Sequence, residues 1–120
     1  MHVLVLALLA GACTSTLPFT NTPLKPYDSN TKFAIDDFDG GFQITVDYTK
    51  YMFISEMDAM NEVGVSKLIH IAEKEALKIG KKIEPIDATK IVKSLGRNGL
   101  TGVTSWSGTA KVMYTTEQNQ

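Results

Sequence analysis

Cysteine is scarce in this sequence, with a single residue at Cys13, and histidine is almost as rare, with only His2 and His70. One cysteine excludes an internal disulfide, and no Cys/His cluster has the spacing of a zinc site. An excess of either charge is also missing, because 12 basic and 13 acidic residues leave a net charge of −1. Without a basic surplus there is no field to attract phosphate backbones, so we do not expect nucleic-acid binding.

Long apolar runs are missing as well. The longest, residues 3–12, falls well short of the roughly 20 apolar residues that a membrane-spanning helix needs. Its length is typical of the hydrophobic part of a secretory signal, and it ends on the small residues Ala10, Gly11 and Ala12, where a peptidase can bind the backbone. We therefore expect residues 1–12 to be an export signal.

Residues 9–13, Leu-Ala-Gly-Ala-Cys, resemble the lipobox of bacterial lipoproteins, although position 10 is Ala where that family usually has Leu. In the family the cysteine thiol receives a diacylglyceryl group, the signal is cut before it, and the new amino terminus is acylated. The resemblance implies lipidation of Cys13 with chains such as palmitate. No basic residue precedes the apolar run, so we expect the true start to lie upstream of Met1. The alternative is a buried apolar segment in which Cys13 is a small core residue.

The resemblance also implies a location. Two or more acyl chains hold a protein stably on a membrane, whereas one holds it only marginally. In Gram-negative lipoproteins an Asp directly after the cysteine favours the inner membrane, and Thr14 stands there in this chain. The expected location is the outer membrane, on its periplasmic face.

The next residues have the composition of a linker. Residues 14–31 contain three of the four prolines and many Ser, Thr and Asn residues, without a helical or strand period. We expect residues 13–31 to be a lipidated tether, residues 32–116 to form the globular domain, and residues 117–120 to be a frayed tail.

Two alternating runs open the domain. Residues 32–36 place Phe33 and Ile35 on one face, and residues 42–48 alternate strictly, which predicts a hairpin around the turn at residues 37–41. From Ser55 the apolar residues follow helical spacing, beginning with a capping-box pattern at residues 55–58 and ending at Gly80. Gly64 lies inside this long predicted helix and is expected to soften or break it.

The pattern after Gly80 supports two interpretations. Residues 88–95 fit a short helix capped by Asp87, whereas Asn98-Gly99 is a hairpin signal between two β-like runs. We predict a strand at residues 83–92, a second β-like run at residues 100–106 and a final strand at residues 109–115, and leave open whether residues 83–95 are strand or helix. The resulting order, β-β-α-β-β, predicts an α+β two-layer sandwich: an antiparallel sheet with one long helix on one face. This order loosely resembles small Gram-negative lipoproteins of unknown function.

No pattern of catalytic, cofactor-binding or metal-ligating residues emerges. Asp36, Asp37 and Asp39 fit a solvated turn better than a calcium loop, because an EF-hand starting at Asp37 would need Glu at position 48, which is Tyr. His70 lacks a nucleophile placed beside it by sequence, and Cys13 lacks an activating neighbour. The glycine-rich residues 96–102 lack the lysine of a phosphate loop. The lysines at the helix end are expected to be solvated rather than to bind lipid, and are Lys74, Lys78, Lys81 and Lys82.

One apolar stretch does not fit the alternation. Tyr48, Tyr51 and residues 52–54 place bulky apolar side chains in succession, and we expect them to belong to the core at the strand-to-helix corner rather than to form a binding patch. The functional expectation is a lipid-anchored, non-catalytic binding or scaffolding protein of the cell envelope. The alternatives are an exported hydrolase-like enzyme that uses His70, and a soluble periplasmic inhibitor or adaptor. The sequence identifies no small-molecule substrate, and the only partners expected are the membrane and an envelope protein.

Overall fold

A computed structural model describes residues 19–115 of the chain. The predicted signal, the predicted lipidation site Cys13, the first part of the predicted tether and the tail at residues 117–120 lie outside the described residues. The elements follow in the order β1 (Lys25–Asp28), β2 (Thr31–Phe38), β3 (Gly41–Tyr51), α2 (Met57–Lys78), the 3₁₀ turn η1 (Ala88–Lys90), β4 (Val92–Arg97) and β5 (Val103–Met113).

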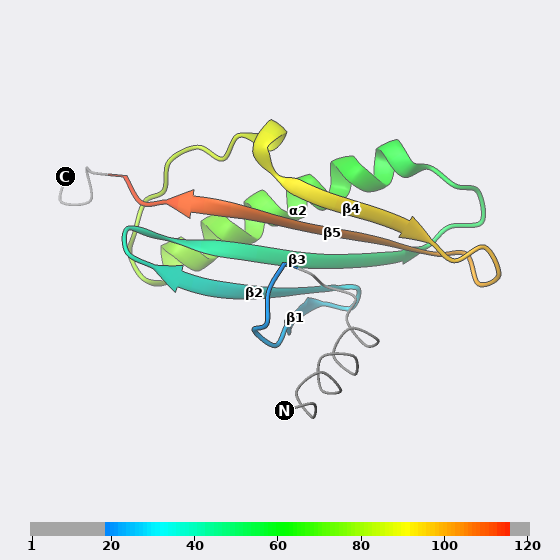
Figure 1. Cartoon of the computed structure of the whole chain (residues 1–120), viewed down its shortest axis with the longest axis horizontal. Helices are drawn as coiled ribbons and strands as arrows, with labels where there is room; N and C mark the ends of the chain where they lie inside the picture. Colours follow the sequence, from blue (N-terminus) through cyan, green and yellow to red (C-terminus); the bar gives the residue numbers. More distant parts are fainter. Residues whose placement is uncertain (1–18, 116–120) are drawn as a thin grey trace, which may run out of the picture.

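The protein is an α+β two-layer sandwich, as the sequence predicted. Five strands form one antiparallel sheet in the order β1-β2-β3-β5-β4. Helix α2 packs on one face of this sheet, against β3 and β5 at its centre (Figure 1). The predicted β-β-α-β-β order is extended by β1, an additional strand at the amino-terminal side.

The predicted β2–β3 hairpin is confirmed. Phe33 pairs with Val46 and Ile35 with Ile44, so the two apolar sets share the face that α2 covers. The turn is shorter than predicted, because Phe38 already pairs with Gly41. Only residues 39 and 40 connect the strands, and Gly40, the second of them, adopts the positive φ, 93°, that favours glycine at this position of a tight turn.

The long helix is also confirmed, with two corrections. The predicted capping box does not form, because Glu56 occupies the N-cap position and makes no side-chain cap hydrogen bond. Gly64 does not soften the helix either, since it is buried against the indole of Trp106, where an added Cβ would lie 2.2 Å from a ring atom. The helix ends as predicted, with Gly80 at φ 71° directly after its last turn.

The predicted strand at residues 83–92 is wrong in its position. Ile83 makes only an isolated bridge to Tyr114, residues 88–90 form the short turn η1, and β4 begins at Val92. The predicted runs at residues 100–106 and 109–115 belong to one strand, β5. The Asn98-Gly99 turn does join two strands, because residues 98–102 connect β4 to β5.

The structure corrects the predicted linker at residues 25–31, because part of this stretch is a strand. Residues 25–28 pair with β2 despite their polar composition, so the sheet begins before Lys32. Upstream of β1, the hydroxyls of Thr20 and Thr22 donate hydrogen bonds to the carboxylate of Asp36, and Gln43 Nε2 donates to the Phe19 carbonyl oxygen. Residues 19–22 are therefore held on the sheet face opposite α2.

Candidate binding surface

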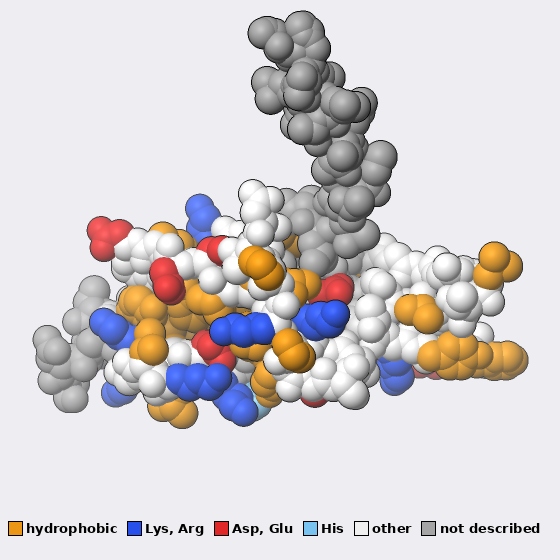
Figure 2. Space-filling model, turned by 90° about the horizontal axis from the view of Figure 1, so that it is seen from below, with side chains coloured by type: hydrophobic (Ala, Val, Ile, Leu, Met, Phe, Trp, Pro, Cys, Tyr) orange, Lys and Arg blue, Asp and Glu red, His pale blue; other side chains and the backbone are white. Residues whose placement is uncertain are grey.

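Exposed apolar side chains gather at one end of the sheet. The most exposed are Leu100 at 97%, Phe53 at 82%, Ile54 at 69% and Tyr51 at 62%, and Val103 is partly exposed beside them. Figure 2 shows apolar side chains at the right-hand end of the molecule, where Figure 1 places the β4–β5 loop and the connection from β3 to α2. We call these five residues the apolar tip.

Hydrogen bonds hold the two loops of the apolar tip together. The Met52 N–H donates to the Gly102 carbonyl oxygen at 2.8 Å. Arg97 Nη2 donates to the Met52 carbonyl oxygen at 2.8 Å and to that of Phe53 at 3.4 Å. Gly102, at φ 79°, lies so close to the Tyr51 ring that a Cβ would come within 2.6 Å of it. The exposed apolar side chains thus project from strand ends and from loops that these hydrogen bonds hold together.

The structure corrects the prediction that this corner belongs to the core. Tyr48 and Met52 are buried, as predicted, but Tyr51, Phe53 and Ile54 are exposed. The reason is that the sheet ends at the pair Tyr51–Val103, and α2 begins only at Met57. The sequence does not identify Leu100, because the predicted β-like run begins at this residue, whereas it lies in the loop between β4 and β5.

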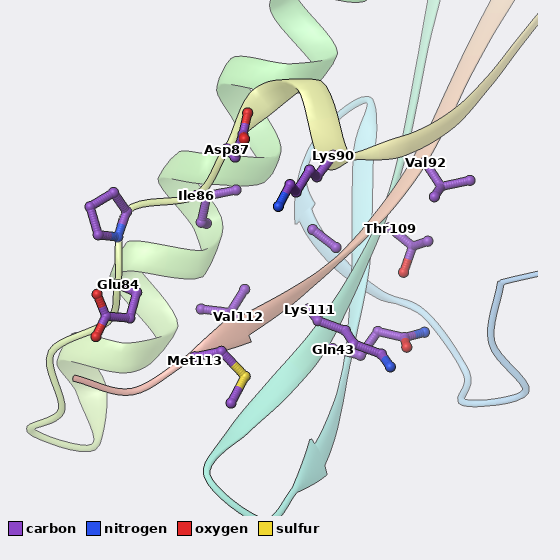
Figure 3. Close-up of a pocket in the computed structure, with 12 residues that line it drawn as sticks. Gln43, Glu84, Ile86, Asp87, Lys90, Val92, Thr109, Lys111, Val112 and Met113 are labelled. Carbon is purple, nitrogen blue, oxygen red and sulfur yellow. The ribbon is translucent and has the colours of Figure 1, made fainter. Parts of the chain in front are cut away.

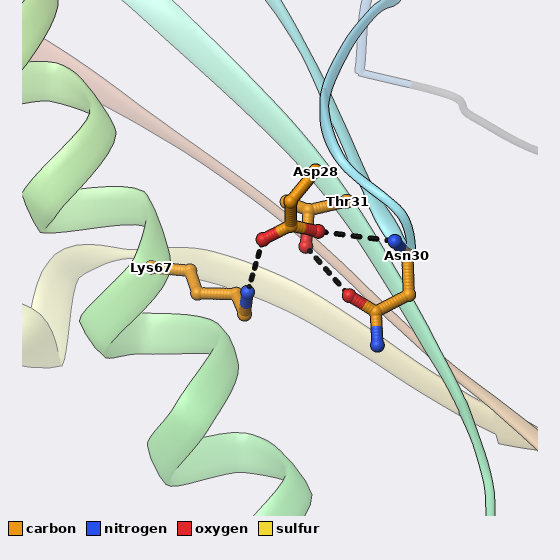
Figure 4. Close-up of polar contacts among 4 residues, drawn as sticks. All are labelled: Asp28, Asn30, Thr31 and Lys67. Atoms are coloured by element: carbon orange, nitrogen blue, oxygen red, sulfur yellow. Dashed lines mark hydrogen bonds and ion pairs between the residues drawn. The ribbon is translucent and has the colours of Figure 1, made fainter.

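His70 lies in a hollow of about 580 Å³ between α2 and β1, lined also by Asp28, Glu62, Ser66 and Lys67. Ser66 precedes His70 by one helical turn, a neighbour that the sequence analysis did not identify. The Asp28 carboxylate accepts hydrogen bonds from Lys67 Nζ at 2.8 Å and from the Asn30 N–H at 3.0 Å (Figure 4). Burial opposes ionisation of Asp28, but these bonds outweigh it and lower its pKa. Within residues 19–115, no hydrogen bond or ion pair joins His70 to another side chain.

The remaining candidates take structural positions. Asp36 binds Thr20 and Thr22, and no group of three or more metal-ligating side chains occurs in the described part of the chain. At the helix end, Lys78 pairs with Glu75 at 2.7 Å, while Lys74 and Lys81 lie over the rings of Tyr27 and Tyr114. Lys82 also has an interaction within the protein. The glycine-rich residues 96–102 form the end of β4 and the β4–β5 turn.

A second cavity, of about 500 Å³, opens where the chain leaves the sheet edge between Ile83 and Val92. Figure 3 shows that Glu84 and Asp87 line it from the connection before β4 and Lys111 from β5. The side chain and N–H of Thr89 donate to Asp87 at 2.6 and 2.9 Å, which lowers the pKa of this carboxyl group. Acidic and basic side chains both line this cavity, so its lining does not indicate a single class of ligand.

Among the described residues, no helix is both long enough and apolar enough to cross a membrane. No protein-family model, curated protein or solved structure matches this chain.

Proposed function

We propose that this protein is a lipid-anchored binding protein of the bacterial cell envelope, attached through Cys13 and directed to the periplasmic face of the outer membrane. Its α+β domain binds a partner protein and performs no catalysis in this proposal. The observation that carries the binding role is the apolar tip. Large apolar side chains exposed together on one surface are typical of interaction sites, whereas single exposed ones are common everywhere.

The rigidity of the apolar tip supports this role. Ordering flexible loops on binding costs free energy, and loops already fixed in the free protein avoid much of that cost. The bonds from Arg97 and between Met52 and Gly102 fix both loops before any partner arrives. Aromatic side chains such as Phe53 and Tyr51 are also among the residues that contribute most to protein interfaces.

The anchor is proposed from the sequence, and metabolic labelling with a clickable palmitate analogue tests it. We expect label on the wild-type chain and on the control Ser15→Ala, and none on Cys13→Ala. Label that persists in Cys13→Ala would refute attachment at this residue. Mass spectrometry of the mature amino terminus distinguishes a lipidated Cys13 from an unmodified one, which would indicate the soluble periplasmic alternative.

Photo-crosslinking in cells tests the binding role. A benzoylphenylalanine placed at Phe53 or at Leu100 should form a discrete crosslinked protein band. The control position is Val63, an exposed apolar residue on α2 outside the apolar tip. Absence of a band at both tip positions, or the same bands at Val63, would contradict the proposal.

A further inference from the structure

Strand β4 forms one edge of the sheet, and its outer side carries unpaired backbone groups. Antiparallel strands alternate between residues whose N–H and C=O point to the partner and residues whose groups point away. The Asn98 N–H donates to the Val103 carbonyl oxygen at 2.9 Å, so the backbone groups of Asn98 face β5. Because the register of β4 is regular and the direction alternates, the backbone N–H and C=O groups of residues 96, 94 and 92 also face β5. The N–H and C=O groups of Lys93, Leu95 and Arg97 therefore point outward.

The opposite edge of the sheet is protected in a way that β4 is not. Strand β1 has only four residues, contains Pro26 and shifts register between Pro26 and Asp28. Short length, proline and irregular pairing are devices that keep an edge from pairing with another chain. Strand β4 has six residues in continuous register and no proline. The β4 edge is thus competent to accept another strand.

A groove lies beside this edge on the helix side. It has a volume of about 440 Å³ and is lined by half-buried Val65 and Ile69 of α2, by Ala88 and by Lys93, with Glu62 among its polar residues. Helix α2 packs on β3 and β5, the two central strands, so the side of the helix toward β4 is only partly covered. A strand added outside β4 would place alternate side chains in this groove.

The charges along β4 determine which kind of strand can pair with its outer edge. Lys93, Leu95 and Arg97 share the helix-side face, since Leu95 pairs with buried Trp106. Neither Lys93 nor Arg97 forms an ion pair with a carboxylate in residues 19–115. If two copies paired antiparallel through β4, centred on Leu95, Lys93 of each would face Arg97 of the other, and like charges directly opposite are destabilising. The edge is therefore better suited to an acidic partner than to itself.

We propose that β4 pairs with an extended segment of a partner protein in which acidic, apolar and acidic residues alternate on one face. The apolar side chain enters the groove beside Val65 and Ile69, and the flanking carboxylates lie opposite Lys93 and Arg97. The same pattern fits either strand direction, because it is symmetric. None of the five residues of the apolar tip belongs to this site, but the two surfaces adjoin, because Arg97 also donates to the Met52 and Phe53 carbonyl oxygens at the tip.

Amide hydrogen exchange measured by NMR on the full-length chain tests the proposal. The probe is the peptide acetyl-TETLTET-amide, and acetyl-TKTLTKT-amide is its charge-reversed control. With the acidic peptide, the outward amides of Lys93, Leu95 and Arg97 should exchange at least tenfold more slowly, while those of Ser94 and Gly96 should not change. The basic peptide should have no effect. Protection of neither set, or equal protection by both peptides, would overturn the proposal.

Two variants sharpen the test. Lys93→Glu should weaken binding of the acidic peptide at least tenfold, whereas Lys50→Glu, an equal charge change at an exposed residue of β3, should leave it unchanged. Leu95→Pro removes an outward N–H but none of the β4–β5 hydrogen bonds, so it should abolish binding. If Leu95→Pro does not fold, Lys93→Glu and the alternating protection still decide.

Two further outcomes are informative. Sedimentation that shows a dimer, with the same three amides protected in the absence of peptide, would replace the partner by a second copy and overturn the charge argument. Phe53→Ser should bind the acidic peptide as the wild type does, because the Phe53 side chain is not part of the β4 site and the carbonyl oxygen that Arg97 binds is retained. Loss of peptide binding in Phe53→Ser would show that the peptide binds the apolar tip, and would overturn its assignment to β4.

Discussion

The side chain of Trp106 packs between the sheet and helix α2, in a narrow slot formed by two glycines. The indole is fully buried between Gly64 of α2 and Gly108 of its own strand, and its Nε1 donates to Asn61 Oδ1 at 2.9 Å. A side chain at either glycine would overlap the ring. The glycine inside the helix is therefore required by packing, not by backbone conformation.

Gly64→Ala consequently tests packing against helix propensity. Alanine favours a helix interior by about 1 kcal/mol over glycine. Overpacking a core costs typically about 1–3 kcal/mol, and the new Cβ would lie 2.2 Å from the indole. We expect a net loss in the free energy of unfolding, measured by urea denaturation. The control Gly96→Ala, with no atom within 4 Å of the added Cβ, should be neutral or slightly stabilising. If Gly64→Ala is as stable as the wild type or more stable, the close packing of Gly64 against Trp106 is not what requires glycine at this position.

Two buried threonines offer a second matched pair. Thr45 and Thr104 are both fully buried, but Thr45 Oγ1 lies 3.3 Å from Thr109 Oγ1, whereas Thr104 Oγ1 has no hydrogen-bond partner among residues 19–115. A buried polar group without a partner is costly. Thr104→Val should therefore stabilise the protein by about 1 kcal/mol, and Thr45→Val should destabilise it by about 1 kcal/mol, in denaturant titrations. The same sign for both variants would contradict this account.

The amino-terminal segment shows how an element of polar composition is held in place. Hydrogen bonds from Thr22 and Thr20 lower the pKa of Asp36 below its ordinary value of 3.8. A lowered native pKa means that the ionised carboxylate stabilises the fold above pH 3.8, and that this contribution is lost as the pH falls through the lowered value.

We therefore expect Asp36→Asn to be less stable than the wild type at neutral pH, with the difference shrinking below pH 3.8. Chemical denaturation across this pH range measures the difference. Asp39→Asn, in the adjacent turn, is the control and should not reproduce this pH profile. A constant difference between Asp36→Asn and the wild type at all pH values would show that the carboxylate charge is not what holds the segment.

Elements with a strong local period could be predicted from the sequence, and the others could not. The alternation at residues 42–48 and the apolar stripe of α2 specify which face is buried, so the hairpin, the helix and the fold class were predicted correctly. The sequence of β1 shows no alternation of apolar and polar residues. This strand is stabilised by pairing with β2 and by an ion pair with Lys67, which is distant in sequence. The prediction that Tyr51, Phe53 and Ile54 are buried was wrong, because an apolar pattern shows which residues could belong to the core but not where the helix that would cover them begins.

At the scale of the whole molecule, the residues bound to the sheet upstream of Lys32 shorten the distance between the proposed anchor and the domain. A linker reaching from Cys13 to Lys32 could extend about 65 Å, at roughly 3.3–3.6 Å per residue. Because Phe19 is already bound to Gln43, only residues 14–18 separate Cys13 from the folded unit, and they span at most about 22 Å. A lipid-anchored protein would then be held with the sheet face opposite α2 toward the headgroups.

Fluorescence quenching by spin-labelled lipid headgroups tests this orientation. In proteoliposomes, a dye on Asn21→Cys, within the segment held on the sheet face opposite α2, should be quenched strongly. A dye on Leu77→Cys, an exposed position on α2, should be quenched weakly, since the sheet lies between it and Phe19. Inserting ten Gly/Ser residues after Thr16 should reduce the contrast, because a linker of that composition is flexible and allows the domain to rotate and to move away. Equal quenching at both positions in the unextended protein would show that the short connection does not orient the domain.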